Sequence, residues 1–142
     1  MISSRLRMVL FHVGCKIENH KDSKKSAVIP RLMVDTGSEF TWIEAAVLKR
    51  IGIEPVKKDL LIQMADGQFI TRSVGFAILR VEQTFTTDEV VFAQEGDWQL
   101  LGCRALEGLN LKVDSRHKKL AAAGPVIAAT AIKLRAENCP TT

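Results

Sequence analysis

Short apolar and β-branched runs separated by turns dominate the hydrophobic pattern of this chain. The predicted strands span 5–15, 28–34, 40–43, 60–64, 69–81, 86–93 and 100–102. A closing hairpin is predicted from 111–113 and 118–120 around the turn 114–117. Two segments, 44–51 and 104–109, instead fit short helices. Short strands at regular spacing with two small helices predict an all-β fold, a small closed barrel-like domain.

Polar residues and turn formers separate these elements. The charged segment 18–26 is predicted to be a surface loop, and 94–99 a polar turn. Pro30 places part of the strand 28–34 at an edge or a strand start, because proline cannot donate to a β-ladder. Gly75 is expected to mark a bend or bulge in the long strand 69–81. The Asp66-Gly67 pair between two apolar flanks indicates a hairpin.

The length of 142 residues fits one domain, which we expect to span 1–120. From position 121 the chain becomes alanine-rich, and we expect 121–142 to form a partly disordered C-terminal tail. No stretch approaches the roughly 18 apolar residues of a membrane span. Arg5 and Arg7 interrupt the first apolar run, which is unlike a signal peptide. We therefore expect a cytoplasmic protein that does not contact a membrane.

Charge and composition argue against nucleic acid as a partner. The net charge is +4, but the basic residues are scattered along the sequence, and the aromatic residues are six Phe, two Trp and no Tyr. The three cysteines and three histidines are too widely spaced for a metal site, so no metal and no cofactor are expected. Cys103 is expected to be buried and inert, and Trp42 and Trp98 to pack in the core or at its rim.

The strongest chemical signal is the point where the apolar run 32–34 ends in Asp35-Thr36-Gly37-Ser38. A carboxylate placed where a strand leaves the core is costly unless it is hydrogen-bonded or used. The tripeptide alone is a weak signal, because an acid in an Asp-x-Gly turn commonly caps its own backbone. Its meaning therefore depends on the segments that come after it in the chain.

Two further segments occur at similar intervals after this turn. They are the hairpin tip Ala65-Asp66-Gly67 and the apolar segment Leu100-Leu101-Gly102 before a helix. In this order the chain resembles the retropepsin-like aspartic proteases, single-domain relatives of pepsin, over roughly 28–120, and 106–114 looks most like bacterial members. The resemblance implies that Asp35 is the catalytic acid. It also implies that 65–67 is the tip of a flap that closes on substrate.

In such an enzyme, two adjacent carboxylates share one proton and supply both the base and the acid of peptide hydrolysis. This chain holds a single Asp-Thr-Gly, so the resemblance implies a homodimer formed about the active site, in which two Asp35 side chains meet. Thr36 would bond across to the opposite turn, Gly37 would permit close approach, and Ser38 would donate to Asp35. The implied activity is an aspartic endopeptidase that acts on an extended peptide at mildly acidic pH.

Apolar candidates for the pocket lining are Ile43, Phe69, Ile70 and Leu100, which predict apolar residues beside the cleaved bond. An alternative is a catalytically inactive protease-like module that binds peptides or only dimerises. The extra N-terminal strand region, the alanine-rich tail and the lack of a visible prosegment keep that alternative open. A nucleic-acid adaptor is a weaker third hypothesis.

Overall fold

The computed structural model describes residues 11–125, and the fold is that of this part of the chain. In chain order its elements are β1 His12–Asn19, β2 Asp22–Val34, β3 Thr41–Glu44, α2 Ala45–Arg50, β4 Lys57–Gln63, β5 Phe69–Val81, β6 Thr84–Ala93, β7 Leu100–Leu101, α3 Cys103–Leu109, β8 Leu111–Asp114 and β9 Lys119–Ala122.

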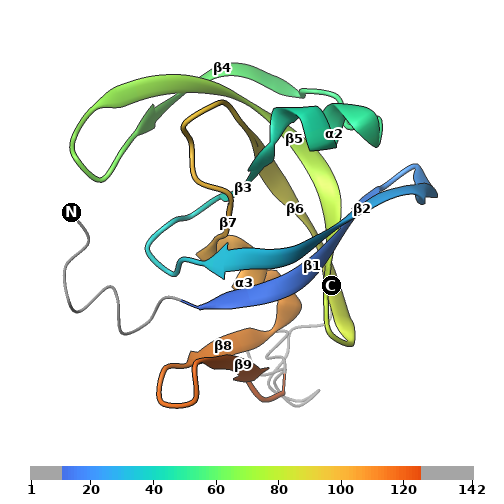
Figure 1. Ribbon diagram of the computed structural model, residues 1–142, viewed down its shortest axis with the longest axis vertical. Coiled ribbons are helices and arrows are strands. Elements are labelled where there is room, and N and C mark those ends of the chain that lie inside the picture. Colours follow the sequence, from blue (N-terminus) through green and yellow to red (C-terminus); the bar gives the residue numbers. More distant parts are fainter. Residues whose placement is uncertain (1–10, 126–142) are drawn as a thin grey trace, which may run out of the picture.

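Seven of these strands form one sheet in the order β1-β2-β7-β3-β6-β5-β4. An additional antiparallel pairing of β1 with β5 joins the sheet back on itself, so that it forms a ring. Strand β4 pairs with β5, and the resulting β4–β5 hairpin arches over one side of the ring (Figure 1). The β8–β9 hairpin forms a separate small sheet. The prediction of an all-β domain with two short helices is confirmed.

The core follows from alternation along the strands. On β5, Ala77, Leu79 and Val81 are completely buried, while the residues between them face outward. Each fully buried Leu or Val stabilises the fold by about 1.5–3 kcal/mol. A second apolar cluster lies under the β4–β5 hairpin and consists of Trp42, Val74, Val91, Ala93 and Leu100. The packing of Trp42 is therefore as expected.

The segment 18–26 is not a surface loop, and this prediction is wrong. Its residues extend β1 and β2 into a hairpin that closes at the pair Asn19 and Asp22. Asn19 is buried, and its amide donates to the carbonyl of Ile51 at 3.0 Å while its oxygen accepts the backbone N–H of Lys21 at 2.8 Å. Pairing of β1 with both β2 and β5 outweighs the polar composition of this segment.

Pro30 lies in a part of β2 that pairs with β1 alone, opposite a register shift between Val13 and Cys15, so its edge position is confirmed. Gly75 marks no bulge, because β5 and β6 stay in register through Gly75 and Val90. Glycine is required there for another reason: a Cβ would lie 2.7 Å from the carbonyl oxygen of Glu54.

Several boundaries differ from the predicted ones. The predicted strand 5–15 lies partly outside the described residues, and β1 begins at His12. The β8–β9 hairpin forms as predicted, but β9 continues to Ala122, past the expected domain end at 120. Most of the predicted tail, 126–142, lies outside the described residues.

Between residues 11 and 125, no helix has the length and apolar character needed to cross a membrane.

Candidate active site

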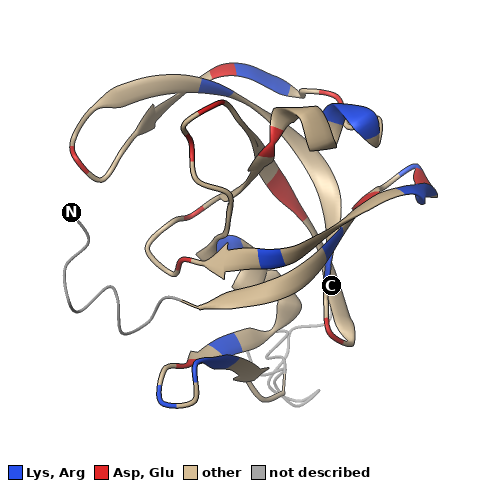
Figure 2. Ribbon diagram, viewed as in Figure 1, with Lys and Arg blue, Asp and Glu red and all other residues tan. Residues whose placement is uncertain are grey.

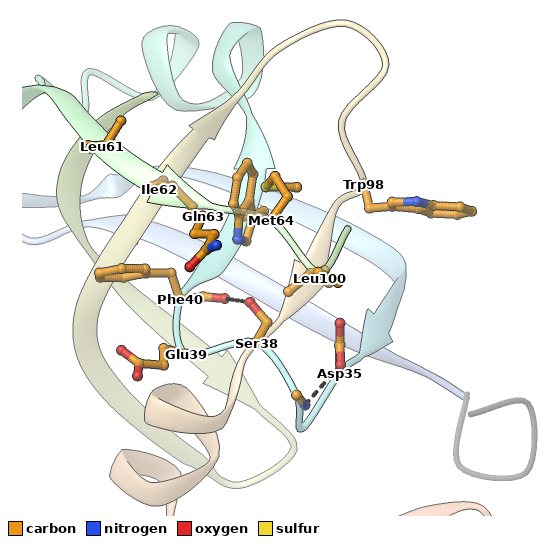
Figure 3. A pocket seen from close by; sticks show the side chains of 13 residues that line it. Asp35, Ser38, Glu39, Phe40, Leu61, Ile62, Gln63, Met64, Trp98 and Leu100 are labelled. Atoms are coloured by element: carbon orange, nitrogen blue, oxygen red, sulfur yellow. Dashed lines mark hydrogen bonds between the residues drawn. The ribbon is translucent and has the colours of Figure 1, made fainter. Parts of the chain in front are cut away.

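The segment 35–38 leaves the end of β2 as a tight, hydrogen-bonded turn. The Asp35 backbone N–H donates to the carbonyl of Leu101 at 2.9 Å, which continues the parallel pairing of β2 with β7. The Asp35 Oδ1 accepts the N–H of Gly37 at 2.9 Å, and the Asp35 carbonyl accepts the N–H of Ser38 at 3.2 Å (Figure 3). The carboxylate is thus oriented by its own turn while remaining partly exposed.

Backbone hydrogen bonds from the start of α3 hold this turn in place. Cys103 donates its backbone N–H to the Ser38 carbonyl at 2.7 Å, and Arg104 donates to the Glu39 carbonyl at 3.2 Å. The N–H of Gly102 donates to the completely buried Thr41 Oγ1 at 3.0 Å. The predicted segment 100–102 therefore lies next to the Asp35 turn and supports it through backbone hydrogen bonds.

The three residues that follow Asp35 have different environments. Thr36 and Gly37 are exposed on the outside of the turn. A Cβ at position 37 would lie 3.2 Å from the Asp35 Oδ1, so a side chain there would crowd the carboxylate. Ser38 does not donate to Asp35, contrary to prediction: its hydroxyl donates to the Phe40 carbonyl at 2.8 Å.

A pocket of about 490 Å³ opens between this turn and the β4–β5 hairpin, a volume typical of small-molecule and peptide sites. Segment 38–40 and β4 lie on opposite sides of it (Figure 3). It is lined by Asp35, Gly37, Ser38, Glu39, Phe40, Trp42, Leu61, Ile62, Gln63, Met64, Ala65, Trp98 and Leu100.

The predicted lining is only partly correct. Leu100 lines the pocket, but Ile43 is completely buried in the main core. Phe69 and Ile70 on β5 are also absent from the lining: Ile70 packs against the cluster under the hairpin, and Phe69 is exposed. Their pairing partners Gln63 and Ile62 on β4 take that place.

The lining residues Phe40, Met64 and Trp98 were not predicted. Phe40 and Met64 are each within five residues of a predicted site segment, 35–38 or 65–67. This closeness in sequence is the signal that could have identified them. Trp98 is exposed by 66%, so it is not a core residue, and its indole extends from the loop before β7 (Figure 3).

The hairpin tip forms as predicted. Met64 donates its N–H to Gln68 at 2.8 Å, and Gly67 donates to Met64 at 2.9 Å with a φ of +87°, which favours glycine. Asp66 accepts the N–H of Gln68 at 3.0 Å. Ala65 lines the pocket, whereas Asp66 and Gly67 are exposed beyond it.

The charged residues of the lining are both acidic, Asp35 and Glu39. Glu39 lies 3.4 Å from the guanidinium of Arg104 on α3, and that guanidinium also stacks over the ring of Phe40. In Figure 2 the loops around the pocket carry acidic positions, whereas basic positions are concentrated on strands, helices and distant turns. Among residues 11–125 there is no cluster of three or more His, Cys, Asp or Glu that could hold a metal ion.

An Asp turn at the end of a strand, supported by an apolar-Gly segment and facing a β-hairpin across a pocket, defines an acid-protease-like domain. Comparison with known families gives the same class: the profile of the aspartyl protease family matches residues 23–105. This match covers more than half of the chain, so the protein belongs to the aspartyl protease family and is retropepsin-like. No curated protein matches the sequence.

Proposed function

We propose that this protein is a homodimeric aspartic endopeptidase in which Asp35 from each of two copies forms the catalytic pair. The observation that supports it best is the position of Asp35, whose oriented and partly exposed carboxylate borders the pocket under the hairpin. Family membership supports peptide hydrolysis as the reaction.

The second carboxylate has to come from another copy. Glu39 is the other acid in the pocket lining, but it lies beside the Arg104 guanidinium, which draws it toward α3. The exposed residues Thr36 and Gly37 face away from the core, where a second turn could meet them about a two-fold axis. This geometry supports Thr36 and Gly37 as interface residues.

The proposed reaction adds water across one peptide bond. The ionised Asp35 of the pair accepts a proton from the water, whose oxygen attacks the carbonyl carbon, and the protonated partner donates its proton to the carbonyl oxygen. The carbon–nitrogen bond then breaks as the nitrogen takes up the proton held by the first carboxylate, while one hydroxyl of the intermediate returns its proton to the partner carboxylate. The products are a carboxylic acid and an amine. The pair must hold one proton at the start, which favours mildly acidic pH.

The substrate is proposed to be an extended peptide with apolar residues beside the cleaved bond. Phe40, Leu61, Ile62 and Leu100 supply apolar surface to the pocket. The flap role of 65–67 is supported by its place at the hairpin tip beside the pocket, with backbone groups exposed to a bound main chain.

Cleavage of an unstructured protein at pH 4 to 6 tests this function. We expect Asp35→Asn to lower the rate by at least about 100-fold, because it removes the acid–base group. Asp22→Asn is the matched control, since the Asp22 Oδ1 also accepts a backbone N–H two residues on, that of Lys24 at 3.1 Å, but Asp22 does not line the pocket. We also expect the wild-type rate per protomer to rise with protein concentration as dimers form.

Equal and slow cleavage by the wild type and Asp35→Asn would contradict the proposal. It would favour the inactive peptide-binding or dimerisation module instead.

A further inference from the structure

The loop 94–99, between β6 and β7, is tied to strand β5 by one ion pair. Arg72 on β5 donates from Nε to the Asp97 Oδ2 at 2.6 Å and from Nη2 to Oδ1 at 2.9 Å. The same carboxylate accepts the N–H of Gln94 at 2.8 Å, and Arg72 Nη1 donates to the Thr71 carbonyl at 2.7 Å. Both partners are therefore fixed by bonds beyond the pair itself.

A second contact fixes the other end of this loop. The side-chain oxygen of Gln99 accepts the backbone N–H of Glu44, at the start of α2, at 3.0 Å. Trp98 lies between the two anchored residues, lines the pocket and is nevertheless 66% exposed. In Figure 1 the loop lies beneath the β4–β5 hairpin, so the two elements border the same pocket.

The Arg72–Asp97 pair differs from the other ion pairs of the described chain. Its side chains are only 15% and 11% exposed, whereas those of Lys57 and Glu89 are 48% and 19% exposed. Bidentate, shielded arginine–carboxylate pairs hold geometry, while exposed pairs contribute little. The hydrogen bond from Arg72 also lowers the pKa of Asp97, so this carboxylate keeps its charge in more acidic solution than an ordinary aspartate.

We propose that Arg72 and Asp97 are positioning residues that brace the loop 94–99 against flap strand β5 and so set the width of the pocket. With the brace in place, Trp98 keeps a fixed position relative to the flap. Without it, the loop and the flap move independently, and the pocket loses its fit to apolar side chains. The consequence for substrate binding rests on the proposed function, but the brace itself does not.

Fluorine NMR of protein labelled with fluorotryptophan tests the brace without any need for activity. The two tryptophan signals are assigned with Trp98→Phe. We expect Asp97→Asn and Arg72→Gln to shift or broaden the Trp98 signal more than that of Trp42, which also lines the pocket but is buried in the cluster under the hairpin. Lys57→Gln, which breaks the exposed pair with Glu89, is the matched control and should move neither signal.

The exchanged double variant, Arg72→Asp with Asp97→Arg, should restore the Trp98 signal at least in part, because it re-forms a pair across the same gap. An unchanged Trp98 signal in Asp97→Asn would overturn the brace. An equally large change in both tryptophan signals would also overturn it, because that pattern indicates general loss of structure.

Kinetics then test the role in substrate binding. With an apolar octapeptide as the probe, we expect Asp97→Asn to raise KM by about 10-fold, equivalent to about 1.4 kcal/mol, with little change in kcat. A fall in kcat with unchanged KM would contradict the positioning role. If the wild type shows no cleavage that depends on Asp35, the proposed function fails, and the NMR result alone decides the brace.

Discussion

Gly102 and Phe40 are packed backbone against backbone. A Cβ at position 102 would lie 2.3 Å from the Phe40 carbonyl oxygen and 2.6 Å from its carbonyl carbon. Flanking hydrogen bonds fix both segments, including those from Cys103 to Ser38 and from Gly102 to Thr41. The contact therefore cannot relax unless the Asp35 turn and the start of α3 move apart.

We expect Gly102→Ala to destabilise the fold by about 1–3 kcal/mol or more, as overpacking against fixed backbone does. Urea unfolding measures the loss. Gly14→Ala is the matched control, because the nearest atom to a Cβ there is the Pro30 carbonyl oxygen at an ordinary 3.7 Å. Equal losses in the two variants would show that the close approach of Phe40 is not what requires glycine.

Asp88 is expected to make the stability of the fold depend on pH. Its Oδ2 is buried without a hydrogen-bond partner in the described chain, and its Oδ1 accepts the N–H of Glu89 at 2.8 Å. Burial raises the pKa of Asp88 above its ordinary 3.8, opposed by that N–H and by the charge of Arg104, while Glu89 and Glu107 add to the rise. Charging Asp88 is therefore harder in the folded chain than in the unfolded chain.

The sign of the effect is set by the raised pKa. Asp88 contributes stability at pH values below its ordinary pKa, and this contribution is lost as the pH rises through the folded pKa. We expect the free energy of unfolding of the wild type, relative to Asp88→Asn, to fall as the pH rises above about 3.8. Urea unfolding across the acidic range measures this difference. A constant difference between the two proteins would contradict the prediction.

Local patterning predicted some elements well because their own residues specify them. The strand Phe69–Val81 has the predicted bounds, since a run rich in apolar and β-branched residues directly follows the Asp66-Gly67 turn. The Asp35 turn could be predicted because its residue types define the turn and its chemistry together. The hairpin of β1 and β2 could not, because β1 also pairs through Lys16, Ile17 and Glu18 with a third strand, β5, far along the chain.

Local sequence patterns do not determine which residues line the pocket. Arg72 and Asp97 are 25 residues apart, and nothing in either neighbourhood indicates the other. The choice between Ile62 on β4 and Ile70 on β5 depends on which of two paired strands faces the turn. Both the ion pair and the lining depend on how segments distant in the sequence are placed in the fold.

The cysteines Cys15 and Cys103 should differ sharply in reactivity. Cys15 is 1% exposed, and burial raises the pKa of its thiol to about 12, despite a backbone hydrogen bond with Arg80 that acts the other way. Cys103 was expected to be buried, but it is partly exposed, because its side chain leaves the first position of α3. The thiolate is the reactive form, so Cys15 should be nearly inert at pH 8.

We expect iodoacetamide at pH 8 to alkylate Cys103 at least about 1,000-fold faster than Cys15 in the folded protein. Peptide mass spectrometry over time measures both rates. A Cys139→Ser background keeps the result simple, since Cys139 lies outside the described residues. In urea the two rates should converge, and similar rates in the folded protein would contradict the prediction.

The buried carboxylate of Glu18 should depend on Arg80 as its partner. Glu18 is 3% exposed and forms an ion pair with Arg80, whose guanidinium stacks over Phe85 with 4.5 Å to the ring centroid. Removing Arg80 leaves an uncompensated charge in the sheet, which costs more than losing the pair itself. Because Arg80 is 43% exposed, water reaches the site and reduces that cost.

We expect Arg80→Ala to lower the free energy of unfolding by about 1–3 kcal/mol. Adding Glu18→Gln should recover part of the loss, because it removes the unpaired charge. Arg31→Ala is the control: Arg31 is also exposed on a strand, and within residues 11–125 its side chain makes one hydrogen bond, to His12 Nδ1 at 3.4 Å, so its loss should cost within about 0.5 kcal/mol. Urea unfolding of these variants and the wild type measures the differences. If Arg80→Ala costs no more than Arg31→Ala, Glu18 does not need its partner, and water alone solvates its charge.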